Sequence, residues 1–281
     1  METFRTKAGI EIPNIIYGTA WKKERTADLV EMALLEGFRG IDTACQPRHY
    51  HEPGVGEGLE RAYKSGIQRE DVFIQTKFTS LSGQDLESVP YDPGTTLSDQ
   101  VQESLEVSLE NLRTPWIDSL VLHSPMNTWP ELQEVWSVVE GFVRDGTVRQ
   151  VGISNCYDLK LLKMLIEWSE IPPAVVQNRF YGQTEYDLDL RRHCREKGIY
   201  YQSFWTLTAN PHLLASETIK SIGQAHGKTP AQILFRFLQQ QNVIILTGTT
   251  SATHMKEDLG IHQFSLSATE VESIDLLGPF I

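Results

Sequence analysis

Cysteine is scarce in this 281-residue chain, and its three cysteines, Cys45, Cys156 and Cys194, lie far apart. An odd number at this spacing indicates neither a disulfide framework nor a zinc motif, so we expect a reducing compartment and no metal site. No apolar run approaches the roughly 20 residues that a membrane span needs. The first residues also lack the apolar segment of a secretory signal, so we expect a cytoplasmic protein that does not bind membranes.

Positive charge is limited as well. The chain has 25 lysines and arginines against 37 aspartates and glutamates, which gives a net charge of −12. This balance argues against nucleic acid or an anionic membrane as a partner and leaves a small molecule as the expected ligand. The length suits one (β/α)8 barrel, which typically needs about 250 residues. The sequence does not indicate an oligomeric state.

Short apolar segments alternate with amphipathic stretches along the chain. The expected strands are 14–18, 38–41, 72–76, 117–122, 148–152, 174–178, 199–203 and 243–247. The expected helices are 26–36, 55–64, 95–111, 130–144, 158–167, 187–197, 213–226 and 230–240. Apolar strands alternating with helices are typical of a parallel sheet, and eight such units favour a closed (β/α)8 TIM barrel. We expect one domain over 1–281, with a short N-terminal β-hairpin closing the bottom of the barrel.

Charged or polar residues directly follow three of the expected strands. Asp42 comes after FRGI, Lys77 after VFIQT and His123 after DSLVL. The carboxyl ends of barrel strands converge on one face, so these side chains are expected to meet there. Tyr50 lies in the first of the loops on that face.

These four residue types fit the reduction of a carbonyl group. A hydride adds to the carbonyl carbon, and the alkoxide that develops needs a proton. Tyr50 can donate that proton if the Lys77 ammonium stabilises the phenolate, and Asp42 can keep Lys77 charged. His123 can direct an N–H group at the carbonyl oxygen.

Four ordered segments of the chain resemble the signature segments of the aldo-keto reductase family. They are Phe38-Arg-Gly-Ile-Asp42-Thr-Ala, Gln75-Thr-Lys77-Phe, Leu120-Val-Leu-His123-Ser-Pro and Val151-Gly-Ile-Ser154-Asn155. The resemblance extends from about residue 4 to residue 260. It implies a (β/α)8 barrel, NADPH as the usual hydride donor, and a catalytic Asp, Tyr, Lys and His that match Asp42, Tyr50, Lys77 and His123.

The tyrosine departs from the family pattern. The family places it five residues after the aspartate, where this chain has Pro47. The loop is lengthened, and Tyr50 precedes a glutamate and a Val-Gly pair much as the family tyrosine does. Counting backward from Val55-Gly56 also permits His49 at the donor position.

The resemblance also implies the cofactor contacts. Ser154, Asn155 and Gln177 match the group that holds the nicotinamide carboxamide, and amide and hydroxyl groups supply the donors and acceptors that a carboxamide needs. Phe204 falls at the position whose aromatic ring stacks on nicotinamide. Glu257 and Asp258 match the residues that contact adenine.

The phosphate-binding segment has lost two basic residues. The family commonly has a lysine and an arginine where this chain has Gly248 and His254. Thr249 and Thr250, ahead of the expected helix 252–259, can still bind phosphate at a helix N-terminus. NADPH is the expected cofactor, and NADH stays as the alternative because two charges that favour the 2′-phosphate are missing.

Three tryptophans, Trp21, Trp129 and Trp205, are candidates for the wall of a substrate pocket, and they favour an apolar or aromatic carbonyl compound. The Gly54-Val-Gly56-Glu-Gly58 run follows no strand and does not predict a Rossmann fold. Two other functions stay open. One is a non-catalytic, cofactor-binding redox sensor or regulatory subunit of the same fold, and the other is a barrel hydrolase or isomerase.

Overall fold

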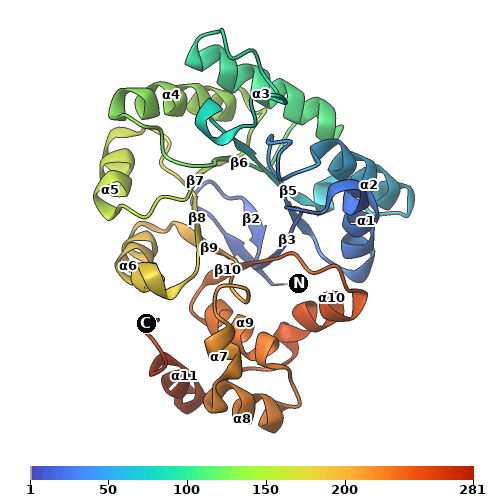
Figure 1. Cartoon of the computed structure of the whole chain (residues 1–281), viewed down its shortest axis with the longest axis vertical. Helices are drawn as coiled ribbons and strands as arrows, with labels where there is room; N and C mark the ends of the chain where they lie inside the picture. The colour runs from blue at the N-terminus through green and yellow to red at the C-terminus, as the bar shows by residue number, and fades with distance from the viewer. Residues whose placement is uncertain (1) are drawn as a thin grey trace.

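The computed structural model describes residues 2–281 and contains a closed barrel of eight parallel strands (Figure 1). The strands follow the order β10-β3-β4-β5-β6-β7-β8-β9 around the barrel. Their bounds are β3 Ile15–Gly18, β4 Gly40–Asp42, β5 Phe73–Phe78, β6 Ser119–Leu122, β7 Val151–Ser154, β8 Val175–Arg179, β9 Tyr200–Phe204 and β10 Val243–Thr247. The expected (β/α)8 barrel is therefore confirmed.

Helices surround the barrel and connect consecutive strands (Figure 1). Three of them end at Gly37, Gly146 and Gly198, whose φ angles of 118°, 85° and 68° lie in the region that glycine adopts without strain. The bounds are α1 Thr26–Glu36, α2 Glu52–Lys64, α3 Leu97–Leu112, α4 Trp129–Asp145, α5 Leu159–Trp168, α6 Leu188–Lys197, α7 Pro211–Ala215, α8 Glu217–His226, α9 Pro230–Gln240, α10 Ala252–Leu259 and α11 Ala268–Asp275.

The structure corrects several of the expected boundaries. The single helix expected over 213–226 is two helices, because Ser216 adopts an extended backbone and its side chain accepts a hydrogen bond from the Ile219 N–H at the start of α8. The strands expected at 117–122 and 148–152 begin at Ser119 and Val151, because Ile117 and Val148 pair only in an isolated bridge outside the strands.

The N-terminal hairpin closes the bottom of the barrel, as expected. It pairs β1 Thr3–Arg5 with β2 Glu11–Pro13 in antiparallel register. Ile12 packs in a buried cluster with interior side chains of the barrel strands, including Ile16, Phe73, Val175 and Ile244. Burial of one such side chain contributes about 1.5–3 kcal/mol to the free energy of unfolding, so this apolar layer anchors the lower half of the barrel.

The interior becomes polar one layer above this cluster. Successive side chains of a strand point to opposite faces, so alternate residues face the same side. On β5 the apolar Phe73 is followed at this spacing by Gln75 and then Lys77, and all three are buried. The upper end of the barrel therefore holds polar side chains away from water, and each needs a hydrogen-bond partner there.

The glycine-rich run 54–58 lies within α2 and allows close helix packing. A Cβ atom added at Gly56 would lie 2.0 Å from the Asn111 carbonyl oxygen, and one added at Gly58 would lie 2.6 Å from the Ala27 carbonyl oxygen. The backbone of α2 therefore lies closer to α3 and α1 than any side chain at these two positions would permit. The run therefore serves helix packing.

Within residues 2–281, none of the helices has both the length and the apolar character that a membrane crossing requires. The same part of the chain contains no cluster of three or more His, Cys, Asp or Glu side chains arranged to hold a metal ion.

Candidate active site

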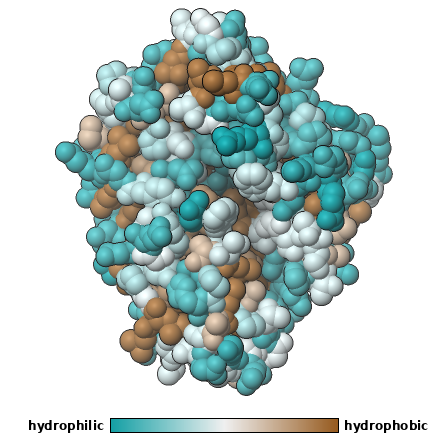
Figure 2. Space-filling view, in the orientation of Figure 1, coloured by the Kyte–Doolittle hydropathy of each residue, from teal (hydrophilic) through white to brown (hydrophobic). Residues whose placement is uncertain are grey.

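A cleft of about 1030 Å³ opens at the carboxyl ends of the barrel strands. Figure 2 shows this face with a hollow near its centre, bordered by hydrophilic and hydrophobic residues. Most of the side chains predicted from sequence line this cleft. They are Trp21, Asp42, Tyr50, His123, Ser154, Asn155, Gln177, Phe204, Trp205, Thr249, His254, Glu257 and Asp258.

Asp42 and Lys77 form a buried ion pair at the base of the cleft. Lys77 Nζ donates to Asp42 Oδ2 and to the Thr43 carbonyl oxygen, each at 2.7 Å. Although burial lowers the pKa of Lys77, the Asp42 carboxylate and Tyr50 raise it more, so the pKa lies above its usual value. A buried charge without its partner is strongly destabilising, so the Asp42 carboxylate keeps Lys77 charged.

Tyr50 lies directly above this pair. The Lys77 ammonium is 5.1 Å from the centre of the Tyr50 ring, and the His123 ring is 5.9 Å away in an edge-on arrangement. Burial raises the pKa of the Tyr50 phenol, and the Lys77 ammonium opposes that rise. The phenol thus stays protonated at neutral pH, beside the cation that stabilises its anion.

The lengthened loop before α2 is held in place by Glu52. This buried carboxylate accepts hydrogen bonds from Thr76 Oγ1 at 2.5 Å, Ser108 Oγ at 3.1 Å and Asn111 Nδ2 at 3.2 Å. Burial raises the pKa of Glu52. Because Tyr50 precedes Glu52 by only two residues, these bonds fix where the tyrosine enters the cleft. The sequence interpretation used Glu52 only to align the loop and missed this role.

His49 occupies a different place at the rim. Its ring packs 4.1 Å from the Trp21 ring, and the Trp21 backbone N–H donates to the His49 carbonyl oxygen at 2.7 Å. Burial and the Arg48 charge lower the pKa of His49. His49 therefore belongs to the cleft wall beside Trp21, whereas Tyr50 belongs to the ion pair at the base.

His123 is a neutral imidazole. Its Nδ1 lies 2.6 Å from Thr79 Oγ1, and its carbonyl oxygen accepts from Asn155 Nδ2 at 2.9 Å. Burial, with smaller effects from Lys77 and His49, lowers the pKa of His123 to about 3. A neutral imidazole carries a single N–H. If Thr79 donates to Nδ1, the proton resides on Nε2, where it can reach a carbonyl oxygen in the cleft.

Three side chains suited to a carboxamide lie together on the next strands. Ser154 Oγ donates to the Gln177 carbonyl oxygen at 2.7 Å, and Asn155 Nδ2 lies 3.4 Å from Ser154 Oγ. Asn155 has a φ of 52°, a left-handed conformation that Asn tolerates better than most residues. Gln177 donates through Nε2 to Asp42 Oδ1 at 3.0 Å, so this group touches the ion pair.

The outer end of the cleft contains a lysine that the sequence interpretation missed. Lys22 Nζ donates to the Gly248 carbonyl oxygen, and a Cβ atom added at Gly248 would lie 3.3 Å from that ammonium. Lys22 thus brings a positive charge from the β3–α1 loop to the place after β10 where Gly248 replaces the lysine common in the family. Its proximity to Gly248 arises from the barrel closure between β10 and β3.

The remaining residues of the outer end surround α10. Thr249 Oγ1 lies 3.5 Å from His254 Nδ1, and Asp258 Oδ2 accepts from Thr247 Oγ1 at 2.7 Å. Burial raises the pKa of Asp258 to about 6. Thr250 is exposed and does not line the cleft. The outer end therefore offers Thr249, His254 and Lys22 to a phosphate group.

One expected pocket residue lies elsewhere. Trp129 begins α4, and its ring packs edge-on against Trp168 at 5.9 Å. It is not among the residues that line the cleft. The strand-to-helix loop after β6 carries Trp129 outward onto the helical layer, so the structure does not support a substrate contact for this residue.

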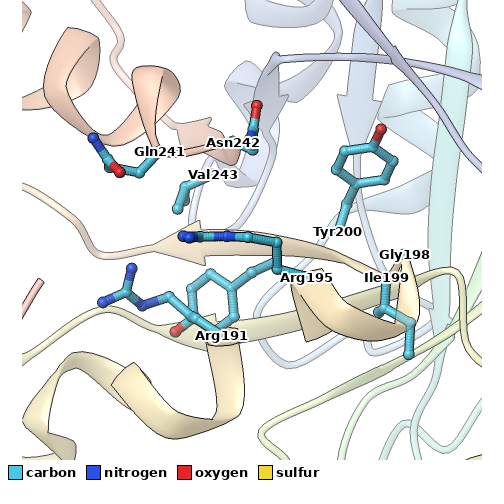
Figure 3. A pocket seen from close by; sticks show the side chains of 9 residues that line it. Arg191, Arg195, Gly198, Ile199, Tyr200, Gln241, Asn242 and Val243 are labelled. Carbon is cyan, nitrogen blue, oxygen red and sulfur yellow. The ribbon is translucent and has the colours of Figure 1, made fainter. Parts of the chain in front are cut away.

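A second cavity of about 210 Å³ lies beside α6 and the start of β10 (Figure 3). Arg191 lines it, but Nε donates to the Tyr186 carbonyl oxygen at 2.8 Å and Nη2 to the Phe280 carbonyl oxygen at 2.7 Å. These bonds tie the C-terminal segment to α6. None of the predicted site residues lines this cavity.

The fold and the cleft define a parallel (β/α)8 barrel with an Asp–Lys–Tyr–His cluster at the carboxyl ends of its strands. The family model for the Aldo/keto reductase family matches residues 14–213, and the chain belongs to this family of oxidoreductases.

The chain is similar to curated and solved members of the family. It is 29% identical to a glyoxal reductase of Bacillus subtilis (strain 168), covering 98% of this chain and 92% of that protein. It is 27% identical to an NAD(P)H-dependent D-xylose reductase of Pachysolen tannophilus, covering 98% and 92%. A crystal structure of an aldo/keto reductase from Brucella melitensis superposes with a TM-score of 0.84 at 28% identity, covering 98% and 99%.

Proposed function

We propose that this protein reduces an aldehyde or ketone to an alcohol with NADPH, and that Tyr50 donates the proton. The observation that carries the proposal is the buried Asp42–Lys77 pair, whose ammonium lies 5.1 Å from the Tyr50 ring centre at the base of an open cleft. A general acid of this kind needs a stabilised conjugate base, and Lys77 supplies the charge.

The residues around the cleft have separate roles in the proposed reaction. His123, neutral and within the same pocket, directs an N–H at the carbonyl oxygen and polarises it. When bound, NADPH supplies the hydride that adds to the carbonyl carbon. Tyr50 then gives its proton to the alkoxide oxygen, and the phenolate that remains is stabilised by Lys77. Solvent returns the proton to Tyr50 after the alcohol leaves.

The cofactor fits the groups that line the rest of the cleft. Ser154, Asn155 and Gln177 offer amide and hydroxyl groups to a carboxamide, and Phe204 offers a ring face to the nicotinamide. Lys22 and Thr249 offer a cation and a hydroxyl to the phosphates. A D-xylose reductase relative is NAD(P)H-dependent by name. NADPH is preferred here because Lys22 supplies one positive charge where the two family residues are absent.

The substrate is a carbonyl compound that fits between Trp21, His49 and Trp205 at the rim. Trp21 and Trp205 are 59% and 48% exposed, so their rings are available to a ligand. The relatives named for glyoxal and D-xylose act on small polar carbonyl compounds. Together these facts favour a small aldehyde, and aromatic aldehydes test the contribution of the tryptophan rings.

A binding titration followed by a turnover assay tests the proposal. We expect NADPH to bind the purified protein with a change in nicotinamide fluorescence, and NADPH oxidation to depend on added aldehyde. Binding without turnover on a broad panel of aldehydes and ketones would favour the redox-sensing subunit. Absence of NADPH and NADH binding would refute both functions.

A further inference from the structure

Three glutamines and Asp42 form a closed hydrogen-bonded group beneath the proposed active site. Gln75 on β5, Gln177 on β8 and Gln202 on β9 are buried in the barrel interior. The sequence positions are far apart, but Gln177 and Gln202 are direct partners in the β8–β9 register. Gln75 reaches them across the barrel, with Gln75 Nε2 2.8 Å from Gln202 Oε1.

The carboxylate of Asp42 determines how two of the amides are oriented. Asp42 Oδ1 accepts from Gln75 Nε2 at 2.7 Å and from Gln177 Nε2 at 3.0 Å. An ionised carboxylate only accepts hydrogen bonds. Both amides must therefore turn their NH2 groups toward Asp42.

Gln202 completes the group because each of those NH2 groups has a second hydrogen to donate. Gln202 Oε1 accepts one from Gln75 at 2.8 Å and one from Gln177 at 2.9 Å, and Gln202 Nε2 donates to Gln75 Oε1 at 3.1 Å. With any one of the three amides reversed, a donor would face a donor or an acceptor would face an acceptor. Asp42 and Gln202 thus fix the orientation of Gln75 and of Gln177, and these two amides fix the orientation of Gln202.

This arrangement leaves the side-chain oxygen of Gln177 open. The Gln177 amide donates both of its hydrogens, one to Asp42 and one to Gln202, so Oε1 is the free end of the side chain. Gln177 also lines the cleft. A free acceptor in that place suits the NH2 group of a nicotinamide carboxamide. A Gln177 amide free to rotate would present either end.

We propose that Gln75 and Gln202 are positioning residues that hold Gln177 as an acceptor toward the cofactor and, through the same amide, orient the Asp42 carboxylate that faces Lys77. Cofactor binding and the proton-donor group are thereby connected through one side chain. The inference rests on the proposed function, because it needs a carboxamide-bearing cofactor in the cleft.

A double-mutant cycle tests this connection. Gln202→Met keeps the length of the side chain but removes the acceptor and the donor. We expect it to raise the dissociation constant for NADPH about fivefold in the otherwise unmodified protein, and less than about 1.5-fold in a Gln177→Met background, because the effect passes through Gln177. Equal effects in both backgrounds, or no effect in a folded variant, would overturn the proposal.

A matched control separates positioning from stability. Gln100 on α3 is another buried glutamine, and its Nε2 donates to the Thr95 carbonyl oxygen at 3.1 Å, away from Asp42. We expect Gln100→Met to lower the melting temperature but to leave the dissociation constant for NADPH unchanged. A weakening of NADPH binding equal to that of Gln202→Met would assign the effect to general destabilisation and overturn the proposal.

Gln202→Glu provides a second variant with a reversible readout. A buried glutamic acid beside the Asp42 carboxylate has a raised pKa, because burial and the like charge disfavour ionisation. Below that pKa its C=O and O–H reproduce the acceptor and donor of Gln202, and above it the carboxylate repels Asp42 and the Gln75 oxygen. We expect NADPH affinity to fall several-fold between pH 6 and 8.5 in this variant only.

The unmodified protein serves as the reference in each measurement. If it binds no NADPH and reduces no carbonyl compound, the proposed function fails and the inference falls with it. If it binds and reduces normally while the cycle is additive and Gln202→Glu shows no added pH dependence, the proposed function stands and the inference alone is wrong.

Discussion

The two ends of the cleft use charge in different ways. At the base, Asp42 and Lys77 are 3% and 1% exposed and form a direct ion pair. At the outer end, Lys22 is partly exposed and donates to a backbone carbonyl oxygen, while Gly248 and His254 stand where the family carries permanent charges. A charge interaction weakens steeply in water. We therefore expect the loss of a charge at the base to cost more activity than the loss of a charge at the outer end.

Removing the ammonium at the base has the largest expected effect. Lys77→Met leaves Asp42 charged without a partner and Tyr50 without a cation, so we expect kcat for NADPH-dependent aldehyde reduction to fall about 1000-fold. Steady-state kinetics measures this.

The double variant Lys77→Met, Asp42→Asn controls for the buried charge. It removes both charges and restores much of the stability that the single variant loses. We expect the double variant to unfold at a higher temperature than Lys77→Met and to remain inactive. Recovery of activity along with stability would show that Lys77 is needed only for folding.

Asp258 is a buried carboxylate at the outer end, and it makes the protein less stable as pH rises. Burial raises its pKa to about 6, against about 3.9 for Asp in an unfolded chain. The native state binds the Asp258 proton more tightly than the unfolded state does. The contribution of protonated Asp258 to the free energy of unfolding is therefore fully present below pH 3.9 and is lost as pH rises through 6. We expect Asp258→Asn to raise the free energy of unfolding by about 3 kcal/mol at pH 8.

The same comparison at lower pH checks this reading of Asp258. The gain from Asp258→Asn should vanish near pH 4, where both proteins are neutral at this position. Denaturant unfolding at the two pH values measures it. Asp189→Asn, at a side chain that is 82% exposed, should change little at either pH. A gain for Asp258→Asn that is the same at both pH values would contradict the role of ionisation.

Lys22 has the smallest expected effect, because its charge is partly exposed to water. We propose that Lys22 makes a charge-assisted hydrogen bond to the cofactor phosphates, which is worth about 1.5 kcal/mol, so we expect Lys22→Met to lower NADPH affinity about tenfold. The neighbouring Lys23 is exposed and does not line the cleft, so Lys23→Met is the matched control. Equal losses for the two variants would indicate a general effect of protein charge.

The barrel itself could be predicted from the sequence because its signals are local. Apolar strands, amphipathic helices and capping glycines such as Gly37 and Gly198 repeat along the chain, and each is read from a few neighbouring residues. The same locality predicted Asp42, Lys77 and His123 at strand ends. The split between α7 and α8 was missed because one capping residue, Ser216, decides it.

The rest of the site depends on pairs that are distant in sequence. Lys22 meets Gly248 only because β10 closes the barrel against β3, and Gln75 meets Gln202 only across the barrel interior. Gln75 and Gln202 each interrupt an apolar strand, β5 and β9, with a polar residue. This was the local signal that could have indicated a buried polar group. Trp129 was predicted from its position after a strand, but its loop turns away from the cleft. The roles of the site residues stay predictions.

The identity of the proton donor is the central claim, and one pair of variants tests it most directly. Tyr50→Phe removes only the hydroxyl group, whereas His49→Gln removes the alternative donor. With NADPH and an aldehyde that the unmodified protein reduces, we expect Tyr50→Phe to lower kcat about 1000-fold while NADPH affinity is kept, and His49→Gln to keep kcat within about fivefold. Full turnover by Tyr50→Phe would contradict the account, and loss of turnover by His49→Gln in the same assay would assign the donor to His49.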